Sequence, residues 1–290
     1  MTSRPASRAA SRPSNPPNRR VREVRRMVDH LRKLPEESPV ALTFNGVTEA
    51  VMMATPCDLA DFGIGFALSE GIIRSAREVS SLEVVCLDGG HDVQMSIPTE
   101  RQQALTARRR KAMGPVGCGL CGIESIEAAL RDLPELAAGL RIDSADIAAA
   151  VDALGRNQPL RAETGAMHGA GLFVPGKGLL RAREDVGRHN ALDKLIGACA
   201  RDGIGPASGA LVISSRVSVD LIQKAVAAGS EILIAVSTPT ELAVSTAERT
   251  GLTLVALVRG EDYRIFSRPE RISHHDAIDE KTAGRNADVA

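Results

Sequence analysis

Aromatic residues are scarce in this 290-residue chain, which has no tryptophan, one tyrosine and five phenylalanines. Few aromatic faces are therefore available to stack on unpaired bases, and this argues against a platform for single-stranded nucleic acid. The chain also lacks an excess of either charge, because 36 Lys and Arg balance 36 Asp and Glu. No global field attracts nucleic acid or an anionic membrane, so an anionic ligand has to meet a local basic cluster.

Long apolar runs and a regular cysteine framework are missing as well. No apolar stretch approaches the length of a membrane span, and the five cysteines form an odd set without the spacing of a disulfide scaffold. We therefore expect a reducing, cytoplasmic location. Residues 1–20 are rich in Ser, Pro and Arg but lack the hydrophobic stretch of a secretory signal, so we interpret them as a disordered basic tail.

Sulfur chemistry is indicated by one short stretch, Gly117-Cys118-Gly119-Leu120-Cys121-Gly122. Two thiols spaced by two residues can chelate a metal, cycle through a disulfide, or carry and resolve a persulfide, and the spacing alone does not choose among these. The pair precedes an amphipathic segment, residues 123–130, and unpaired amides at a helix start stabilise anions. Cys118 is therefore the candidate nucleophile, with Cys121 as the second thiol.

Four basic residues, 108–111, lie shortly before the dithiol. They either favour the ionised thiols and guide an anionic sulfur acceptor, or simply form a solvated helix end that suits the macrodipole. The other three cysteines, Cys57, Cys86 and Cys199, lie within apolar patterns, so we interpret them as buried packing residues.

The first half of the fold reads as an α+β domain over residues 21–140 that carries the dithiol loop. A polar helix is expected before Pro35, and Asn45-Gly46 predicts a hairpin between residues 40–44 and 47–53. Further elements follow in order: a helix over 58–70 ended by Gly71, a hairpin of 82–87 with 93–97 joined by residues 88–92, and a helix over 99–112.

The second half reads as an α/β domain over residues 141–270, followed by a polar tail over 271–290. After a helix over 145–154 closed by Gly155 and an irregular segment at 157–159, a hairpin joins 170–174 to 179–183. Asn190 is positioned to cap a helix over 191–201, with Asp193 at its third position.

Strands and helices then alternate. Strands are predicted over 209–214, 231–236 and 252–258, and the helices between them begin at Ser218 and at a capping box over 238–241. Right-handed crossovers would make these strands parallel and bring their carboxyl ends to one edge.

Polar residues gather where these strands end, and this edge is where open α/β sheets bind ligands. Hydroxyls, free amides and arginine there suit a phosphorylated ligand, although ordinary loop and cap chemistry explains the same residues equally well. The run 183–190, rich in side chains able to bind a ligand, favours the ligand interpretation, and His168 adds weaker support. The candidates in these two regions are Ser214, Arg216, Thr238, Arg188, His189 and Asn190.

Together these motifs resemble the formate dehydrogenase accessory sulfurtransferase family (FdhD). The matching stretches span residues 38–272, and the run from Arg183 to Lys194 is the most specific. The others are Asn45-Gly46, Thr55-Pro56, Gly65-Phe66 with residues 69–73, Cys118 to Gly122, Thr164-Gly165 with His168, residues 214–224 and residues 252–269.

The resemblance implies a homodimeric sulfur carrier. It would take persulfide sulfur from a cysteine desulfurase onto Cys118 and pass it to the molybdenum (or tungsten) bis(guanine dinucleotide) cofactor, a bound substrate, before that cofactor enters formate dehydrogenase. The resemblance also implies a cytidine-deaminase-like second domain. We expect no tightly bound structural metal, because a zinc site would need two more ligands near the dithiol and only the distant His168 or His189 could supply them. Its cofactor-binding run falls on Leu257, Val258, Arg259, Gly260, Glu261 and Asp262.

Several positions depart from the family pattern, and no departure removes a thiol. Gly117, Ala166, Ser215 and Asp220 differ from the usual residues, and the pair Glu261-Asp262 places negative charge beside a phosphate-rich ligand. A zinc deaminase is disfavoured because its His-x-Glu and Pro-Cys-x-x-Cys motifs are missing. A dithiol oxidoreductase and a cofactor-binding chaperone that moves no sulfur remain as alternatives.

Overall fold

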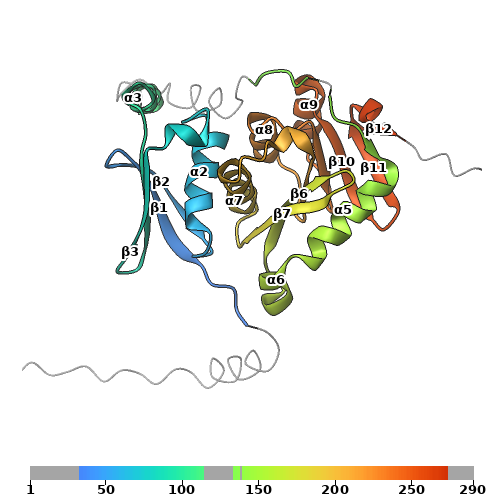
Figure 1. Cartoon of the computed structure of the whole chain (residues 1–290), viewed down its shortest axis with the longest axis horizontal. Coiled ribbons are helices and arrows are strands. Elements are labelled where there is room, and N and C mark those ends of the chain that lie inside the picture. The colour runs from blue at the N-terminus through green and yellow to red at the C-terminus, as the bar shows by residue number, and fades with distance from the viewer. Residues whose placement is uncertain (1–32, 114–132, 138, 274–290) are drawn as a thin grey trace, which may run out of the picture. The chain divides into compact units, whose positions relative to one another are not determined.

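A computed structural model of the chain describes residues 33–113, 133–137 and 139–273 (Figure 1). The chain divides into residues 1–34, of which only the last two are described, and residues 35–290, which hold every element below. The predicted basic tail, the predicted helix before Pro35, Cys118, Cys121 and most of the predicted polar tail lie outside the described residues. In the part that is described, no helix has the length and apolar character needed to cross a membrane.

A four-stranded sheet forms from the first half of the chain, with the order β2-β1-β4-β3. The predicted first hairpin is confirmed, and Asn45 and Gly46 turn it with φ angles of 47° and 79°. The predicted connection at 88–92 is too long, because residues from Gly90 onward already pair in the second hairpin and leave a two-residue turn. The strands are β1 (Ser38–Phe44), β2 (Val47–Ala54), β3 (Ser81–Leu87) and β4 (Gly90–Ser96).

Helix α2 (Leu59–Ser69) confirms the predicted helix over 58–70 and covers one face of this sheet. Phe62 on the helix and Phe44 on β1 are fully buried in the shared core. Helix α3 (Thr99–Met113) follows the sheet and confirms the predicted helix there. A short 3-10 turn, η1 (Ala76–Glu78), connects α2 to β3.

A six-stranded sheet forms the centre of the second half, with the order β11-β10-β9-β8-β6-β7. The predicted parallel strands β8, β9 and β10 are confirmed, and β6 joins β8 antiparallel. The edge strand β11 was missed, because its six residues give only a short alternation of polar and apolar side chains. The strands are β6 (His168–Val174), β7 (Gly178–Asp185), β8 (Ala210–Ile213), β9 (Ile232–Ala235), β10 (Thr253–Arg259) and β11 (Asp262–Ser267).

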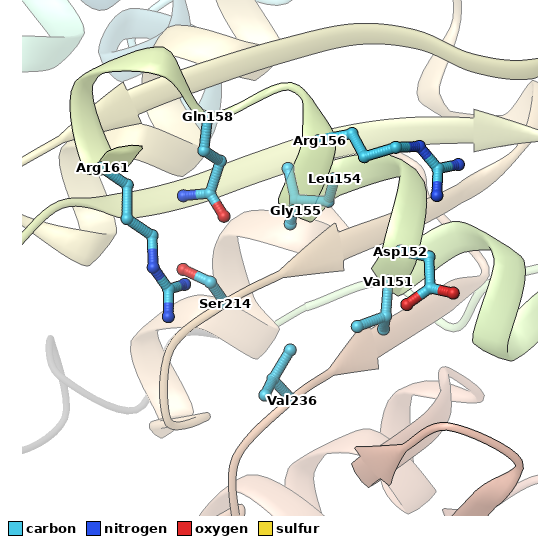
Figure 2. Close-up of a pocket in the computed structure, with 9 residues that line it drawn as sticks. All are labelled: Val151, Asp152, Leu154, Gly155, Arg156, Gln158, Arg161, Ser214 and Val236. Carbon is cyan, nitrogen blue, oxygen red and sulfur yellow. The ribbon is translucent and has the colours of Figure 1, made fainter. Parts of the chain in front are cut away.

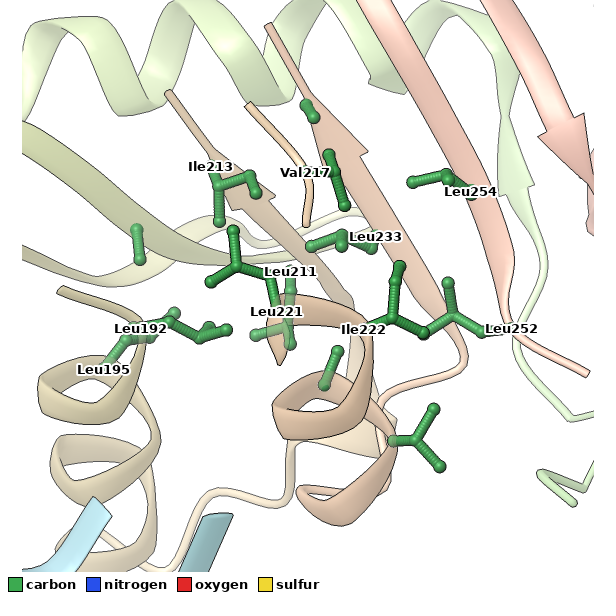
Figure 3. Close-up of a cluster of buried hydrophobic side chains, with 14 of the residues drawn as sticks. Leu192, Leu195, Leu211, Ile213, Val217, Leu221, Ile222, Leu233, Leu252 and Leu254 are labelled. Carbon is green, nitrogen blue, oxygen red and sulfur yellow. The ribbon is translucent and has the colours of Figure 1, made fainter. Parts of the chain in front are cut away.

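Helices pack on both faces of this sheet. Helices α7 (Arg188–Arg201), α8 (Val219–Ala227) and α9 (Glu241–Thr250) pack on one face, where α7 and α8 bury leucines and isoleucines and α9 buries alanines. Figure 3 shows Leu192 of α7 and Leu221 of α8 beside Leu233 of β9. Helix α5 (Ser144–Arg156) covers the other face. The remaining short elements are α6 (Pro159–Thr164), η2 (Pro206–Ser208), η3 (Pro269–Arg271), β5 (Ile142–Asp143) and β12 (Ile272–Ser273). The mixed α/β architecture is thus confirmed.

Three predicted helix ends are wrong. Helix α7 begins at Arg188 after Gly187, so Asn190 lies inside the helix and does not cap it. Helix α9 is capped by Thr240, whose Oγ1 accepts from the amide of Ala243, rather than by the earlier threonine of the predicted box. Helix α5 runs through Gly155 to Arg156, and α6 begins at Pro159, the last residue of the segment predicted as irregular. Local sequence signals place such ends only to within a few residues.

The two sheets are joined through a close crossing of α2 and α7. A Cβ on Gly65 would lie 1.7 Å from the carbonyl oxygen of Asp193, and one on Gly197 would lie 1.9 Å from that of Asp61. Only glycine permits this approach of two helix backbones. Each sheet keeps a hydrophobic core of its own, and the domain boundaries drawn from the sequence stay a prediction.

Candidate functional site

The loops that follow the parallel strands meet at one edge of the six-stranded sheet. The amide of Val217 donates to the carbonyl of Thr238 at 3.2 Å, and the amide of Thr240 donates back to Val217 at 3.0 Å. The amide of Leu257 donates to Ser237 at 3.4 Å. The structure therefore brings the ends of β8, β9 and β10 together, as the strand order predicted.

Ser214 anchors the start of β6 to this edge. Its hydroxyl oxygen accepts from the amide of Gly169 at 2.8 Å, and its own amide donates to the carbonyl of Gly169 at 3.0 Å. His168, which the sequence singled out only weakly, is consequently held beside the strand ends.

Three arginines act on His168 through their charge. Burial lowers the pKa of this histidine, and the positive charges of Arg188, Arg161 and Arg216 lower it further. Arg188 and Arg216 were candidates from the sequence. Arg161 was missed, since nothing in the local pattern around α6 distinguishes it from a solvated helix residue.

These three arginines have no carboxylate partner in the described part of the chain, although Arg181, Arg183 and Arg201 all do. The Nε of Arg188 is in addition buried without an acceptor among the described residues. Guanidinium groups that gather without counter-charges repel one another, and an anion would offset that cost. We call Arg161, Arg188, Arg216 and His168 the arginine cluster.

Two helix starts reinforce the positive potential of the arginine cluster. His189 on α7 lies with its Nε2 3.3 Å from the hydroxyl of Ser218, the residue that precedes α8, and 3.9 Å from a carboxylate oxygen of Asp220. Neither helix has a side-chain cap. Burial and the charge of Arg188 lower the pKa of His189. The amides at both helix starts therefore add to a site that suits phosphate or another anion.

A cavity of about 560 Å³ opens beside the arginine cluster, between the end of α5, α6 and the ends of β8 and β9 (Figure 2). Arg161 and Ser214 connect the cavity to His168. Both line the cavity, the charge of Arg161 acts on His168, and Ser214 accepts from the amide of the next residue, Gly169. The sequence gave no indication of the lining residues on α5, because they share their helix with ordinary core positions.

Most of the run 183–190 binds other parts of the protein. Asp185 pairs with Lys194 at 2.7 Å, both side chains being fully buried. The carboxylate of Glu184 accepts from the first amides of α6 at 2.8 Å. Asn190, proposed as a ligand contact, donates from Nδ2 to the carbonyl of Met53 and to Asp185. Arg188 and His189 are thus the members of the run whose side chains reach the strand-end edge.

The run from Leu257 to Asp262 forms the end of β10 and the turn into β11. Leu257 has a φ of 59° within a bulge, and Val258 is buried. Arg259, Gly260, Glu261 and Asp262 are exposed. Only the first residue of this run is hydrogen-bonded to the strand-end edge, through the Leu257 amide. The cofactor contacts of the run stay a prediction.

The three thiols outside the dithiol differ from one another. Cys199 is fully buried, and burial raises its pKa to about 11. Cys57 is half-buried, with a pKa that burial also raises. Cys86 is exposed, so its interpretation as a buried packing residue is wrong. Among the residues whose placement is described, no group of three or more His, Cys, Asp or Glu is arranged to hold a metal ion.

Comparison with known proteins relates the whole folded region to one family. Residues 35–273 match the model of the FdhD/NarQ family. The "Sulfur carrier protein FdhD" of Agrobacterium fabrum is 53% identical over 242 residues, 83% of this chain and 89% of the relative. The protein of the same name from Xanthomonas oryzae pv. oryzae is 48% identical over 244 residues, 84% of this chain and 87% of the relative.

A solved structure agrees with these matches. The crystal structure of a protein from Desulfotalea psychrophila, described as a candidate formate dehydrogenase accessory protein, is 28% identical, with a TM-score of 0.65 over 83% of this chain and 90% of that one. The extent of the sequence matches, together with this shared fold, shows that the chain belongs to the FdhD/NarQ family.

Proposed function

We propose that this protein is a sulfur carrier that receives persulfide sulfur from a cysteine desulfurase and delivers it to the molybdenum bis(guanine dinucleotide) cofactor required by formate dehydrogenase. The observation that carries the proposal is the match, over more than four-fifths of the chain, to relatives named as sulfur carriers. The dithiol Cys118 and Cys121 supplies the chemistry that such a role needs.

The arginine cluster supports the cofactor half of the proposal. The cofactor is a substrate here, and each of its dinucleotide arms carries diphosphate charge. Three arginines without counter-charges, placed beside two uncapped helix starts, suit that charge. Two equivalent guanine nucleotides per cofactor would also suit a homodimer, which analytical ultracentrifugation of the purified protein tests.

The sulfur transfer is a pair of exchange steps. The Cys118 thiolate attacks the terminal sulfur of the desulfurase persulfide, forming a new S–S bond while the desulfurase thiolate leaves. The Cys121 thiolate then attacks the Cys118 sulfur, which forms a disulfide between the two cysteines and expels hydrosulfide toward the cofactor. A thiol reductant reduces that disulfide and restores the dithiol. Both steps conserve sulfur atoms, and the reductant supplies the two electrons of the last step.

Intact-mass spectrometry after incubation with a cysteine desulfurase and cysteine tests the carrier role. We expect the wild type to gain one sulfur that dithiothreitol removes, and Cys118→Ala to gain none. Cys86→Ala is the matched control, because Cys86 is an exposed thiol outside the dithiol and its loss should leave the gain unchanged. If Cys118→Ala gained sulfur like the wild type, the assignment of the persulfide would be wrong. If no form gained sulfur while guanine nucleotide still bound, the cofactor-chaperone alternative would replace sulfur transfer.

A further inference from the structure

A second cavity, of about 370 Å³, opens at the other edge of the six-stranded sheet, away from the arginine cluster. Pro206, shortly before β8, and Ala228, shortly before β9, line it, so it lies at the amino ends of these parallel strands. Leu68 of α2 and Ile196 of α7 provide apolar walls. We call this cavity the amino-end groove. A protein bound in it would leave the strand-end edge accessible.

Two exposed arginines, Arg74 and Arg77, line the amino-end groove and form no ion pair with any described residue. Hydrogen bonds hold their backbone: the Ser75 hydroxyl oxygen accepts from the amide of Arg77 at 3.3 Å, and the Glu78 carboxylate accepts from the amide of Arg74 at 3.2 Å. The charge of Glu78 is already offset, because its carboxylate pairs with Arg101 at 2.6 Å. The groove therefore presents fixed positive charge that suits the carboxylates of a partner.

The size of the groove suits an extended chain. One turn of an α-helix, about 5.4 Å long and about 10 Å across, occupies more than the volume of this cavity. Ala227, the last residue of α8, lines the groove, and its carbonyl accepts no hydrogen bond from a described residue. The last carbonyls of a helix lack an intrahelical donor, so this one can accept from a backbone amide of an added chain. An extended segment with acidic and apolar side chains thus matches the arginines, the carbonyl and the apolar walls.

The groove is also connected to the helix that leads to the dithiol. Arg77 belongs to η1, and Glu78 of the same turn pairs with Arg101 near the start of α3. Helix α3 ends at Met113, five residues before Cys118. The helix rises about 18 Å from Arg101 to its end, and five extended residues span at most about 18 Å, so chain length keeps Cys118 within about 36 Å of Arg101. A small domain has roughly that diameter, so one partner can fill the groove and meet the thiol at the same time.

We propose that the amino-end groove docks an acidic, extended segment of the protein that donates the persulfide. The proposal rests on the proposed function, because it names the surface that holds the sulfur donor beside Cys118. The donor fits this groove better than the enzyme that receives the cofactor, since that enzyme has to approach the strand-end edge, where we place the cofactor. Docking raises the effective concentration of the persulfide at the thiol and leaves the exchange chemistry unchanged.

Sulfur uptake on Cys118 from two sources tests the proposal. One source is a cysteine desulfurase with cysteine, and the other is glutathione persulfide, which needs no docking surface. We expect the double variant Arg74→Glu, Arg77→Glu to raise the desulfurase concentration for half-maximal uptake by about tenfold at low salt, with an unchanged maximal rate. Its uptake from glutathione persulfide should equal that of the wild type. The matched control is Arg141→Glu, Arg264→Glu, which makes the same charge change at two exposed arginines outside the groove and should alter neither uptake.

A second variant and a competitor test the groove without removing its arginines. Ala227→Phe fills the groove, and because Ala227 is exposed the larger side chain should not disturb folding. It should also raise the half-saturating desulfurase concentration by about tenfold. A synthetic peptide of alternating glutamate and leucine should inhibit uptake from the desulfurase but not from glutathione persulfide. A peptide of alternating lysine and leucine should inhibit neither.

Several results would overturn the proposal. Unchanged uptake from the desulfurase in both groove variants would remove the docking role, and equal weakening in the matched control would assign the effect to overall charge. Slower uptake from both sources would mean that the variants disturb the dithiol. If removal of residues 274–290 abolished the effect of the groove variants, the groove would hold this chain's own C-terminal segment. Loss of self-association in the groove variants, measured by sedimentation, would assign the groove to a second copy.

The two sulfur sources also separate this proposal from the proposed function. A wild type that takes up sulfur from neither source, yet binds the desulfurase through Arg74 and Arg77 in calorimetry, retains the docking surface and loses the carrier role. A wild type that takes up sulfur, with groove variants that behave alike, retains the carrier role and loses only the docking surface.

Discussion

The cations buried between the two sheets are paired with carboxylates, whereas the arginines at the strand-end edge are paired with no described carboxylate. Between the sheets each cation has a carboxylate: Lys194 pairs with Asp185 at 2.7 Å, and Lys224 pairs with Asp193 at 2.9 Å. At the edge, the arginines around His168 have none in the described part of the chain. Paired charges fix the packing of α2 against α7 and α8, whereas unpaired charges keep binding capacity for a ligand. The contrast supports the proposal that the edge is the ligand-binding surface, and it does so without reference to any motif.

The largest effect should come from removing a buried cation. Lys194 is fully buried, and its Nζ also donates to the carbonyl of Thr55 at 2.9 Å. Lys194→Met leaves the Asp185 carboxylate buried without its counter-ion, which should lower the free energy of unfolding by about 3–5 kcal/mol, measured by urea denaturation. Arg216→Met, which removes an exposed and unpaired cation, should change it by less than about 0.5 kcal/mol. Equal losses in the two variants would erase the distinction between the regions.

An intermediate effect is expected in ligand binding. Arg188→Gln removes a guanidinium that has no carboxylate partner among the described residues. It should lower the affinity for pyrophosphate by about tenfold, measured by calorimetry. Arg201→Gln is the matched control, because Arg201 is already paired with Asp61 at 2.6 Å, away from the edge. Its loss should leave pyrophosphate affinity unchanged. Comparable weakening in both variants would mean that general positive charge, rather than the arginine cluster, attracts the anion.

The smallest effect should be the pH dependence of stability that comes from the two histidines at the strand-end edge. Burial and nearby arginines lower the pKa values of His168 and His189 from their ordinary 6.5, while Asp185 and Asp220 act in the opposite direction. The unfolded chain then binds more protons below pH 6.5, so the contribution of these histidines to stability is complete above that pH and is lost as the pH falls. Thermal unfolding of the wild type should therefore show a decline between pH 7 and pH 5.5 that the double variant His168→Gln, His189→Gln reduces.

Added sulfate sharpens the pH measurement. Sulfate stays dianionic over this range, and protonation of the two histidines increases the positive charge that it meets at the edge. Its stabilising effect in thermal unfolding should consequently be larger at pH 5.8 than at pH 8. An identical sulfate effect at both pH values, in wild type and double variant, would show that the histidines do not face the anion.

The sequence predicted the repeating parts of the fold well. Asn45-Gly46 predicted the first hairpin. The alternation of apolar strands and capped helices predicted that β8, β9 and β10 are parallel and are connected by α8 and α9. Hydrophobic period and turn chemistry are local properties, so they can be read without knowing the partners of each segment. The edge strand β11 and the short α6 were missed because the alternation in β11 is brief and the six residues of α6 are too few to show a helical period.

The sequence by itself determined most of the order of the elements and the presence of the dithiol, and it predicted the edge that we propose as the ligand site. The tertiary structure alone decided what each polar residue does there. In the run 183–190 it turned Asp185 and Asn190 inward, toward Lys194 and Met53, and it brought Arg161 beside His168. The reason is physical: a side chain binds a ligand only when no protein group satisfies it, and its competing partners can lie more than a hundred residues away, as Met53 does from Asn190. Local sequence spacing does not show which distant group will bind a polar side chain, because that depends on how the chain folds.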